Sequence, residues 1–292
     1  MSEYPGLSLV FMSQYFWPGT YFLYFNVRFD LDVLPFSELR RVITFITITK
    51  VMIIIIAIMD ITIIKVTICA ILALGLSSPA LSQDAYQEKR ETMVRRQIKD
   101  RGVTDEATLR ALRTVPRHLF VPENYRSRAY EDGPLPIGYG QTISQPYIVG
   151  YMTEAIRPKA GFKVLEVGTG SGYQAAVLAE IADKVYTIEI VKELAQQADS
   201  RLKRMGYDNV EVKTGDGYHG WKEHAPYDAI IVTAAAEFIP PPLIEQLKPG
   251  GIMIIPVGSP FMVQTLMLVE KKEGKAVSKS LFPVRFVPFT RG

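Results

Sequence analysis

The sequence predicts an α/β fold in which a doubly wound, mostly parallel sheet ends with an antiparallel strand and follows an amino-terminal helical extension. Three observations predict it. Between residues 146 and 257, short apolar runs alternate with helical patterns, as in parallel sheets covered on both faces. One run leads directly into the glycine-rich loop "VLEVGTGSGY". The last two runs flank "KKEGK", which is typical of an antiparallel hairpin.

Residues 1–82 differ in composition from the rest, so we expect the folded domain to span residues 83–292. The stretch 42–76 is almost wholly apolar, but no 18 of its residues are free of charge, which leaves a transmembrane helix unsecured. Residues 59–82 have the form of a secretory signal peptide. Lys65 precedes "VTICAILALGL", and the small residues Ala80 and Ser82 stand where a signal peptidase would cleave. This stretch therefore predicts a signal peptide or a membrane anchor. The alternative is that translation starts further downstream and that the residues before that start are not part of the natural protein.

The first elements of the domain are predicted to be helical. Residues 85–100 carry many charges and are expected to form an exposed helix that Gly102 ends; a second helix, at about 105–113, begins behind Thr104 as its N-cap. The stretch 115–122 has two prolines and is expected to be an extended connector. Residues 123–144 are rich in glycine and proline and are predicted to be one long loop, a feature usually tied to function or disorder.

The alternation then begins with a helix that Ser144 is expected to cap, with Pro146 in its first turn. Further helices are predicted at 173–182, 191–205 and 241–247. The predicted strands are 163–167, 184–190, 209–213, 228–232, 250–257, 263–270 and 276–282.

Composition excludes several classes of function. The net charge is only +3, and no long Lys/Arg run occurs, so a nucleic-acid partner is disfavoured. The single cysteine, Cys69, allows neither a disulfide framework nor a CxxC site. The three histidines have no metal-ligand spacing, and we expect no metal.

The loop after the strand at 163–167 is the strongest functional signal. Gly168, Gly170 and Gly172 permit a tight turn and close approach of a ligand to the backbone, at the positive end of the following helix. Glu189 ends the next strand, where an acidic side chain can accept both ribose hydroxyls, and Asp216 in "GDG" could accept from an adenine amino group. Such acidic groups would repel a pyrophosphate but tolerate a sulfonium cation.

In these residues the chain resembles the class I S-adenosylmethionine-dependent methyltransferases, which have a Rossmann-like fold. Within that class, "GYGQTISQPYIVGYMTEAI", "DAIIVTAA" and the terminal "VRFVPF" resemble the protein-L-isoaspartate O-methyltransferase family, from about Tyr86 to Phe289. The resemblance implies that residues 83–292 are a catalytic domain that transfers a methyl group from S-adenosyl-L-methionine to the α-carboxyl of isoaspartyl residues in damaged proteins. It also implies a cytoplasmic location, whereas segment 42–82 suggests an exported (periplasmic) or membrane-tethered protein.

The resemblance also assigns roles to residues. It implies that Ser144 is the active-site residue, with Thr142 on the same rim and Arg285 a candidate anion partner for the substrate. The cofactor is expected to contact residues of the two glycine loops and the acid between them: Gly168, Thr169, Gly170, Gly172, Glu189, Asp216 and Gly217. The substrate carboxylate is already ionised at neutral pH, so a hydroxyl that positions it is enough and no strong base is needed.

Other functions fit less well. The fourth strand ends in "VTAAAEFIP" rather than Asn/Asp-Pro-Pro-Tyr, which disfavours methylation of nucleic-acid amines. A dinucleotide-dependent oxidoreductase would need groups that bind phosphate. The open alternatives are a methyltransferase for another small-molecule or protein carboxylate, and a binding protein without catalysis. We expect a monomer whose partners are isoaspartyl peptides and proteins, with membrane contact only if the extension is retained.

Overall fold

The computed structural model describes residues 40–41, 43–52, 54–55, 80–260 and 262–292, and its contacts divide the chain into the units Met1–Ser78 and Pro79–Gly292. In the first unit the described residues are helical. The candidate signal sequence lies outside the described residues except for residues 80–82, and Cys69 lies outside them as well. Within the described ranges, no helix is both long and apolar enough to cross a membrane.

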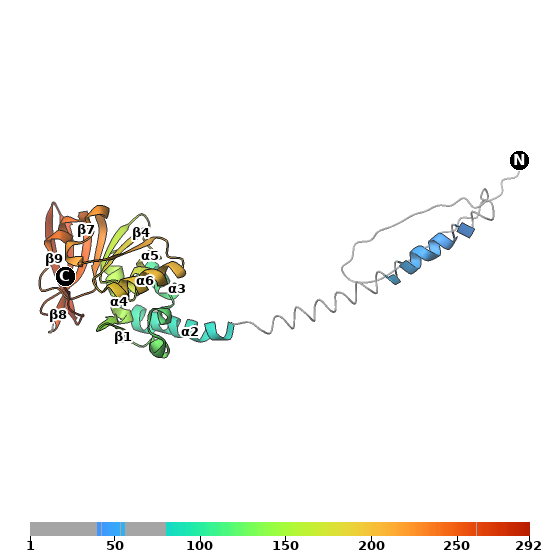
Figure 1. Cartoon of the computed structure of the whole chain (residues 1–292), viewed down its shortest axis with the longest axis horizontal. Helices are drawn as coiled ribbons and strands as arrows, with labels where there is room; N and C mark the ends of the chain where they lie inside the picture. Colours follow the sequence, from blue (N-terminus) through green and yellow to red (C-terminus); the bar gives the residue numbers. More distant parts are fainter. Residues whose placement is uncertain (1–39, 42, 53, 56–79, 261) are drawn as a thin grey trace. The chain divides into compact units, whose positions relative to one another are not determined.

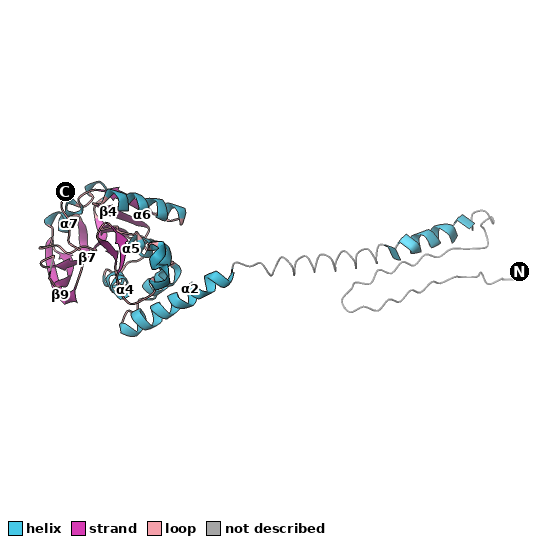
Figure 2. Ribbon diagram, turned by 60° about the horizontal axis from the view of Figure 1, so that its bottom comes forward, coloured by secondary structure: helices cyan, strands magenta, loops and turns pink. Residues whose placement is uncertain are grey.

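The second unit is built on a seven-stranded sheet in the order β5-β4-β3-β6-β7-β8-β9 (Figures 1 and 2). Its parallel strands are β3 (Lys163–Val167), β4 (Lys184–Glu189), β5 (Val210–Thr214), β6 (Tyr227–Val232) and β7 (Leu247–Val257). The sheet closes with two antiparallel strands, β8 (Gln264–Lys272) and β9 (Lys275–Val284). The predicted α/β fold is confirmed. Strands β3 to β5 extend the sheet to one side and strands β6 to β9 extend it to the other, so the strand order switches between the parallel neighbours β3 and β6.

Alternating side chains of the central strands bury two apolar faces. Val164, Val185 and Ile231 pack on one face, beneath α5 (Tyr173–Ala179) and α6 (Lys192–Arg204). Leu165 and Ile230 pack on the other face, where the described cover is α7 (Pro241–Glu245), two 3-10 turns, Gly217–His219 and Lys222–His224, and residues without helical structure such as Ile239 and Phe289. The helical cover is therefore thick on one face and thin on the other.

The amino-terminal helices pack onto the thick side. Helix α2 (Ala80–Thr92) continues through a π-helical turn (Met93–Ile98) into a 3-10 turn (Lys99–Arg101), which Gly102 ends in a left-handed conformation as predicted. The expectation of an exposed helix is wrong for Met93, Val94 and Ile98, which are fully buried. Their apolar side chains fill the core between α3 (Glu106–Thr114) and α4 (Pro146–Ala155).

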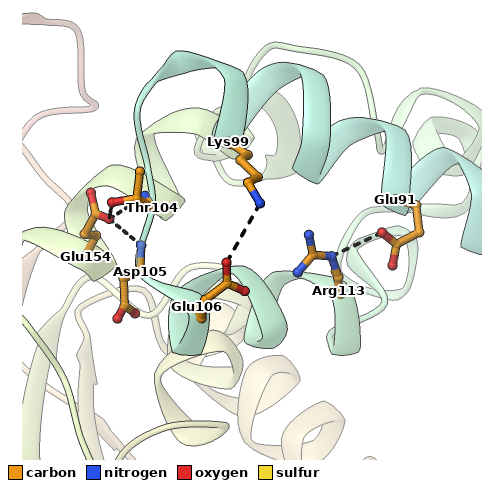
Figure 3. A network of polar contacts seen from close by, with 7 residues as sticks. All are labelled: Glu91, Lys99, Thr104, Asp105, Glu106, Arg113 and Glu154. Atoms are coloured by element: carbon orange, nitrogen blue, oxygen red, sulfur yellow. Dashed lines mark hydrogen bonds and ion pairs between the residues drawn. The ribbon is translucent and has the colours of Figure 1, made fainter.

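Polar contacts fix the start of α3 (Figure 3). Glu154 of α4 accepts hydrogen bonds from the backbone N–H groups of Thr104 (2.6 Å) and Asp105 (2.7 Å). The predicted N-cap Thr104 is wrong, because the side chain of Asp105 caps the helix by accepting from the N–H of Thr108 at 2.7 Å. Two ion pairs, Lys99–Glu106 (3.8 Å) and Arg113–Glu91 (3.1 Å), join α3 to α2 and to the 3-10 turn that follows it (Figure 3).

The stretch predicted as connector and loop is more regular than the sequence indicates. Residues Arg117–Phe120 form a 3-10 turn instead of an extended connector, and Glu123–Arg128 form another. Residues 135–143 form a small antiparallel hairpin of β1 (Leu135–Gly138) and β2 (Gln141–Ile143). Gly138 and Gly140 both have positive φ, which the turn of the hairpin requires. Because glycine is also typical of loops, the sequence pattern does not distinguish this hairpin from a loop.

The predicted cap of α4 is also wrong. The helix begins at Pro146, and Gln145 occupies the N-cap position without a capping side-chain bond. Ser144 lies one residue further out, at the end of β2, where its carbonyl oxygen accepts a hydrogen bond from Arg117.

Candidate active site

A cleft opens at the carboxyl ends of β3, β4 and β6, where parallel sheets of this topology bind ligands. The space between its walls is about 550 Å³, open solvent at the mouth included. The walls come from segments far apart in the sequence: Gln141, Thr142, Val167, Gly168, Gly170, Ile188, Glu189, Ile190, Gly217, Thr233, Ala234, Val287, Pro288, Phe289 and Thr290.

The glycine loop forms the floor of the cleft. Gly168, Gly170 and Gly172 all have positive φ (101°, 52° and 84°), a conformation that favours glycine. A Cβ at Gly168 would overlap the hydroxyl of Thr233, whose single proton lies within reach of the carbonyl oxygens of Gly168 (2.7 Å) and Val167 (3.1 Å). The glycine at 168 is therefore required both by the backbone and by the side chain opposite.

Glu189 links the loop to the next strand. Its carboxylate accepts from the N–H of Gly170 at 2.8 Å and from the N–H of Val191 at 3.0 Å, one bond on each oxygen. A carboxylate has about four acceptor positions, so each oxygen can accept once more. Because Glu189 lines the cleft, these free positions suit the two hydroxyls of a ribose.

A buried chain of hydroxyl groups supports the loop from below. Glu166 accepts from the hydroxyl of Thr187 at 2.5 Å, and the hydroxyls of Thr187 and Thr169 are 2.6 Å apart. Glu166 is fully buried; burial, together with the charge of Glu189, raises the pKa of Glu166 to about 8 despite the bond from Thr187. Glu166 is therefore protonated at neutral pH, and Thr169 contacts this network beneath the cleft.

Asp216 stands beside the cleft, next to Gly217, and follows β5, the neighbour of the strand that Glu189 ends. Its carboxylate accepts from the N–H of Tyr218 (2.9 Å) and from Nε of Arg291 (2.8 Å), and the guanidinium of Arg291 lies 3.6 Å from the centre of the Tyr218 ring. Burial acts to raise the pKa of Asp216, but the bonds from Arg291 and Tyr218 outweigh it, and the pKa lies below its usual value. Asp216 is thus held as an oriented anion.

The predicted substrate residues lie at different distances from this cleft. Thr142 lines it from strand β2, and Ser144 follows two residues later, half-buried, without lining it. Arg285 is exposed and does not line the cleft. Of the predicted cofactor residues, Gly168, Gly170, Glu189 and Gly217 line the cleft, whereas Thr169, Gly172 and Asp216 stand behind or beside it.

Part of the cleft wall comes from two stretches that carry the family resemblance. "DAIIVTAA" supplies Thr233 and Ala234, and the terminal "VRFVPF" supplies Val287, Pro288 and Phe289, whereas the neighbouring Thr290 was not expected in the wall. The segment returns across the cleft because the backbone of Ala235 donates to Val287 (2.8 Å) and accepts from Phe289 (2.9 Å). Arg291 lies 75 residues from its partner Asp216, so no local pattern could pair them.

The donors and acceptors of the cleft suit S-adenosylmethionine better than a dinucleotide. Glu189 lines the cleft and Asp216 stands beside it, and the lining residues include no lysine or arginine to hold a pyrophosphate. In the part of the chain that the structure describes, no three His, Cys, Asp or Glu side chains are grouped to hold a metal ion.

Comparison with known proteins agrees with this chemistry. The family model described as protein-L-isoaspartate(D-aspartate) O-methyltransferase matches residues 88–292. A protein-L-isoaspartate O-methyltransferase of Opitutus terrae is 61% identical over 212 residues, covering 73% of this chain and 91% of that protein. A second, from Syntrophobacter fumaroxidans, is 58% identical over 221 residues, covering 72% and 90%. A crystal structure from Plasmodium falciparum with the same family name, in complex with S-adenosyl-L-homocysteine, is 27% identical with a TM-score of 0.60, covering 70% of this chain and 99% of that one.

Proposed function

The chain belongs to the protein-L-isoaspartate O-methyltransferase family, and from this premise we propose how its cleft performs the reaction. The enzyme transfers a methyl group from S-adenosyl-L-methionine to the α-carboxyl of isoaspartyl residues in damaged proteins, which initiates their repair. When bound, S-adenosylmethionine supplies a methyl group on a positively charged sulfur. The protein has to hold that group and a carboxylate in line, and to exclude water from between them.

The arrangement of Glu189 carries the cofactor assignment. Because one carboxylate bridges the N–H groups of Gly170 and Val191 and still lines the cleft, it can accept both ribose hydroxyls without moving. Asp216, oriented by Tyr218 and Arg291, is proposed to accept from the adenine amino group. Gly168, Thr169, Gly170, Gly172 and Gly217 are proposed to let the cofactor approach the backbone.

Ser144 and Thr142 are proposed to hold the substrate carboxylate. Strand β2 carries Thr142 on the wall of the cleft, and the N–H groups at the start of helix α4 follow directly after Ser144. Hydroxyl and N–H donors fix an anion without the strong pairing of a nearby lysine, so the carboxylate keeps its reactivity. Arg285, exposed and outside the cleft, is proposed to contact acidic groups that flank the isoaspartyl residue.

The test uses the full chain, methyl-labelled S-adenosylmethionine and two peptides that differ only in Asp or isoAsp. We expect base-labile label on the isoAsp peptide alone, and a large loss of it in Ser144→Ala. The matched control is Ser127→Ala, an exposed serine on the 3-10 turn Glu123–Arg128, which should keep full activity. Label on both peptides would indicate a broader carboxylate specificity, and full activity of Ser144→Ala would refute the role of that residue.

We propose that the enzyme acts in the cytoplasm, as a monomer and without nucleic acid. The cytoplasm is where S-adenosylmethionine is made, and the modest net charge of +3 gives no basis for binding a polyanion. Cell fractionation of the tagged chain tests the location, because export through residues 59–82 would give a shorter, extracytoplasmic product.

A further inference from the structure

Arg117 is a buried cation that the reaction described above does not use. It lies in the 3-10 turn Arg117–Phe120 and is fully buried. Burial lowers its pKa to about 10, so the guanidinium stays charged at neutral pH. None of its hydrogen bonds goes to a carboxylate: Nε donates to the carbonyl of Ala129 at 2.8 Å and Nη2 to the carbonyl of Ser144 at 2.7 Å, while Nη1 has no partner. Buried charges are usually paired, and this one is not.

The two carbonyls mark the ends of one segment. Residues 129–144 contain the β1–β2 hairpin, whose Gln141 and Thr142 line the cleft. The guanidinium therefore holds both ends of the segment that carries the candidate substrate residues. A planar fork with several fixed donors can do this, whereas an ammonium group cannot reproduce the fixed directions.

The same cation contacts the helix that begins at the glycine loop. Its guanidinium carbon lies 5.0 Å from the centre of the Tyr173 ring, a favourable distance for a cation–π contact. Tyr173 is the first residue of α5 and follows Gly172, the last glycine of the loop. Phe120, from the same 3-10 turn as Arg117, packs edge-on against Tyr173 at 5.5 Å, which fixes that ring.

We propose that Arg117 is a positioning residue that sets Ser144 and the hairpin in register with the cofactor loop. The proposal rests on the role proposed for Ser144 above. Arg117 acts by holding the Ser144 carbonyl, and its contact with Tyr173 ties that carbonyl to the helix that begins at the loop. A misplacement of about 1 Å in such a site can lower a rate roughly a hundredfold. Precise positioning of Ser144 therefore explains why a buried cation without an anionic partner is retained here.

The test is a double-mutant cycle in the full chain with Arg117→Lys and Ser144→Ala. Lysine keeps the charge but loses the fork, so we expect kcat for the isoAsp peptide to fall roughly ten- to hundredfold. The dissociation constant of S-adenosylhomocysteine should change less than about threefold, because the cofactor loop keeps its own contacts. The matched control, Arg110→Lys, changes an exposed arginine of α3 in the same way and should leave kcat unchanged.

The cycle separates the possible outcomes. If Arg117 acts through Ser144, its replacement adds little to the loss already caused by Ser144→Ala. An equal loss of kcat in both backgrounds, or no loss at all, overturns the proposal. Full activity of Ser144→Ala alone overturns the role of Ser144 instead, while methylation of the isoAsp peptide by the unchanged enzyme still stands.

A second variant keeps the proposal falsifiable if Arg117→Lys fails to fold. Arg117→Met removes the buried charge and fills similar volume, so it lacks the cost of an unpaired cation. Folded Arg117→Met with S-adenosylhomocysteine affinity intact and kcat lowered supports the proposal. The same variant with unchanged kcat refutes it.

Discussion

The steric fit between Gly168 and Thr233 gives a prediction whose size can be worked out. In Gly168→Ala the new Cβ must take φ near 101° and overlaps the Thr233 hydroxyl. The strained backbone costs about 1–3 kcal/mol. If the hydroxyl moves away, the one hydrogen bond that its proton makes, about 1 kcal/mol, is lost as well. We expect the free energy of unfolding to fall by about 2–4 kcal/mol.

Such a loss leaves a folded protein if the domain has ordinary stability, about 5–15 kcal/mol. The assay is urea denaturation of the full chain, followed by circular dichroism, with calorimetric titration of S-adenosylhomocysteine. Gly161→Ala is the matched control, because Gly161 also has positive φ (82°) but its Cβ would meet nothing within 4 Å. Gly161→Ala should lower the free energy of unfolding only by the cost of the strained backbone, and it should keep the affinity for S-adenosylhomocysteine.

The double variant Gly168→Ala/Thr233→Ala isolates the part of the destabilisation that comes from the overlap between the new Cβ and the Thr233 hydroxyl. Removing the hydroxyl relieves the overlap, so the two changes together should cost less than the sum of their separate effects. Equal losses for Gly168→Ala and Gly161→Ala, or strict additivity with Thr233→Ala, would refute the steric reasoning.

Two further predictions concern charged groups. The pKa of Glu166 rises from 4.5 in the unfolded chain to about 8 in the folded protein, so the stability that its protonated form contributes is fully present below pH 4.5 and is lost as the pH rises through 8. Between pH 5 and 8 this lowers the free energy of unfolding by up to about 1.4 kcal/mol per pH unit. Glu166→Gln should abolish that pH dependence in denaturation curves. An equal pH slope in both proteins would mean that Glu166 is ionised when buried. Arg291→Ala removes the hydrogen bond that orients Asp216 and should weaken S-adenosylhomocysteine binding, measured by calorimetry, roughly three- to tenfold. The expected effect is this small because Arg291 is partly exposed and solvent screens its charge. Tighter binding would show that Arg291 obstructs the cleft.

The sequence was sufficient for the sheet and the cofactor loop because both are encoded locally. Each central strand is a short apolar run, and the glycines at 168, 170 and 172 follow one of them directly. The acid at 189 could be placed because parallel strands end at one edge of a sheet. The antiparallel strands β8 and β9 were visible from the turn between them.

What the sequence did not reveal depends on contacts between distant segments. The β1–β2 hairpin has strands of only four and three residues, and its prolines and glycines favour a loop. Ser144 was expected to cap α4 because serine is a common cap, but its carbonyl is bound to Arg117 and the helix starts two residues later. Arg117 itself had one local signal, a charge between the apolar residues Val115 and Phe120.

The return of residues 287–290 across the cleft has a consequence for synthesis of the chain. The ribosome makes the glycine loop about 120 residues before this wall, so every other part of the cleft leaves the ribosome earlier. A nascent chain that has reached β9 already holds Glu189 and the loop, yet it lacks Val287–Thr290 and Arg291. Cofactor binding to the complete cleft therefore has to wait until translation has passed the last strand.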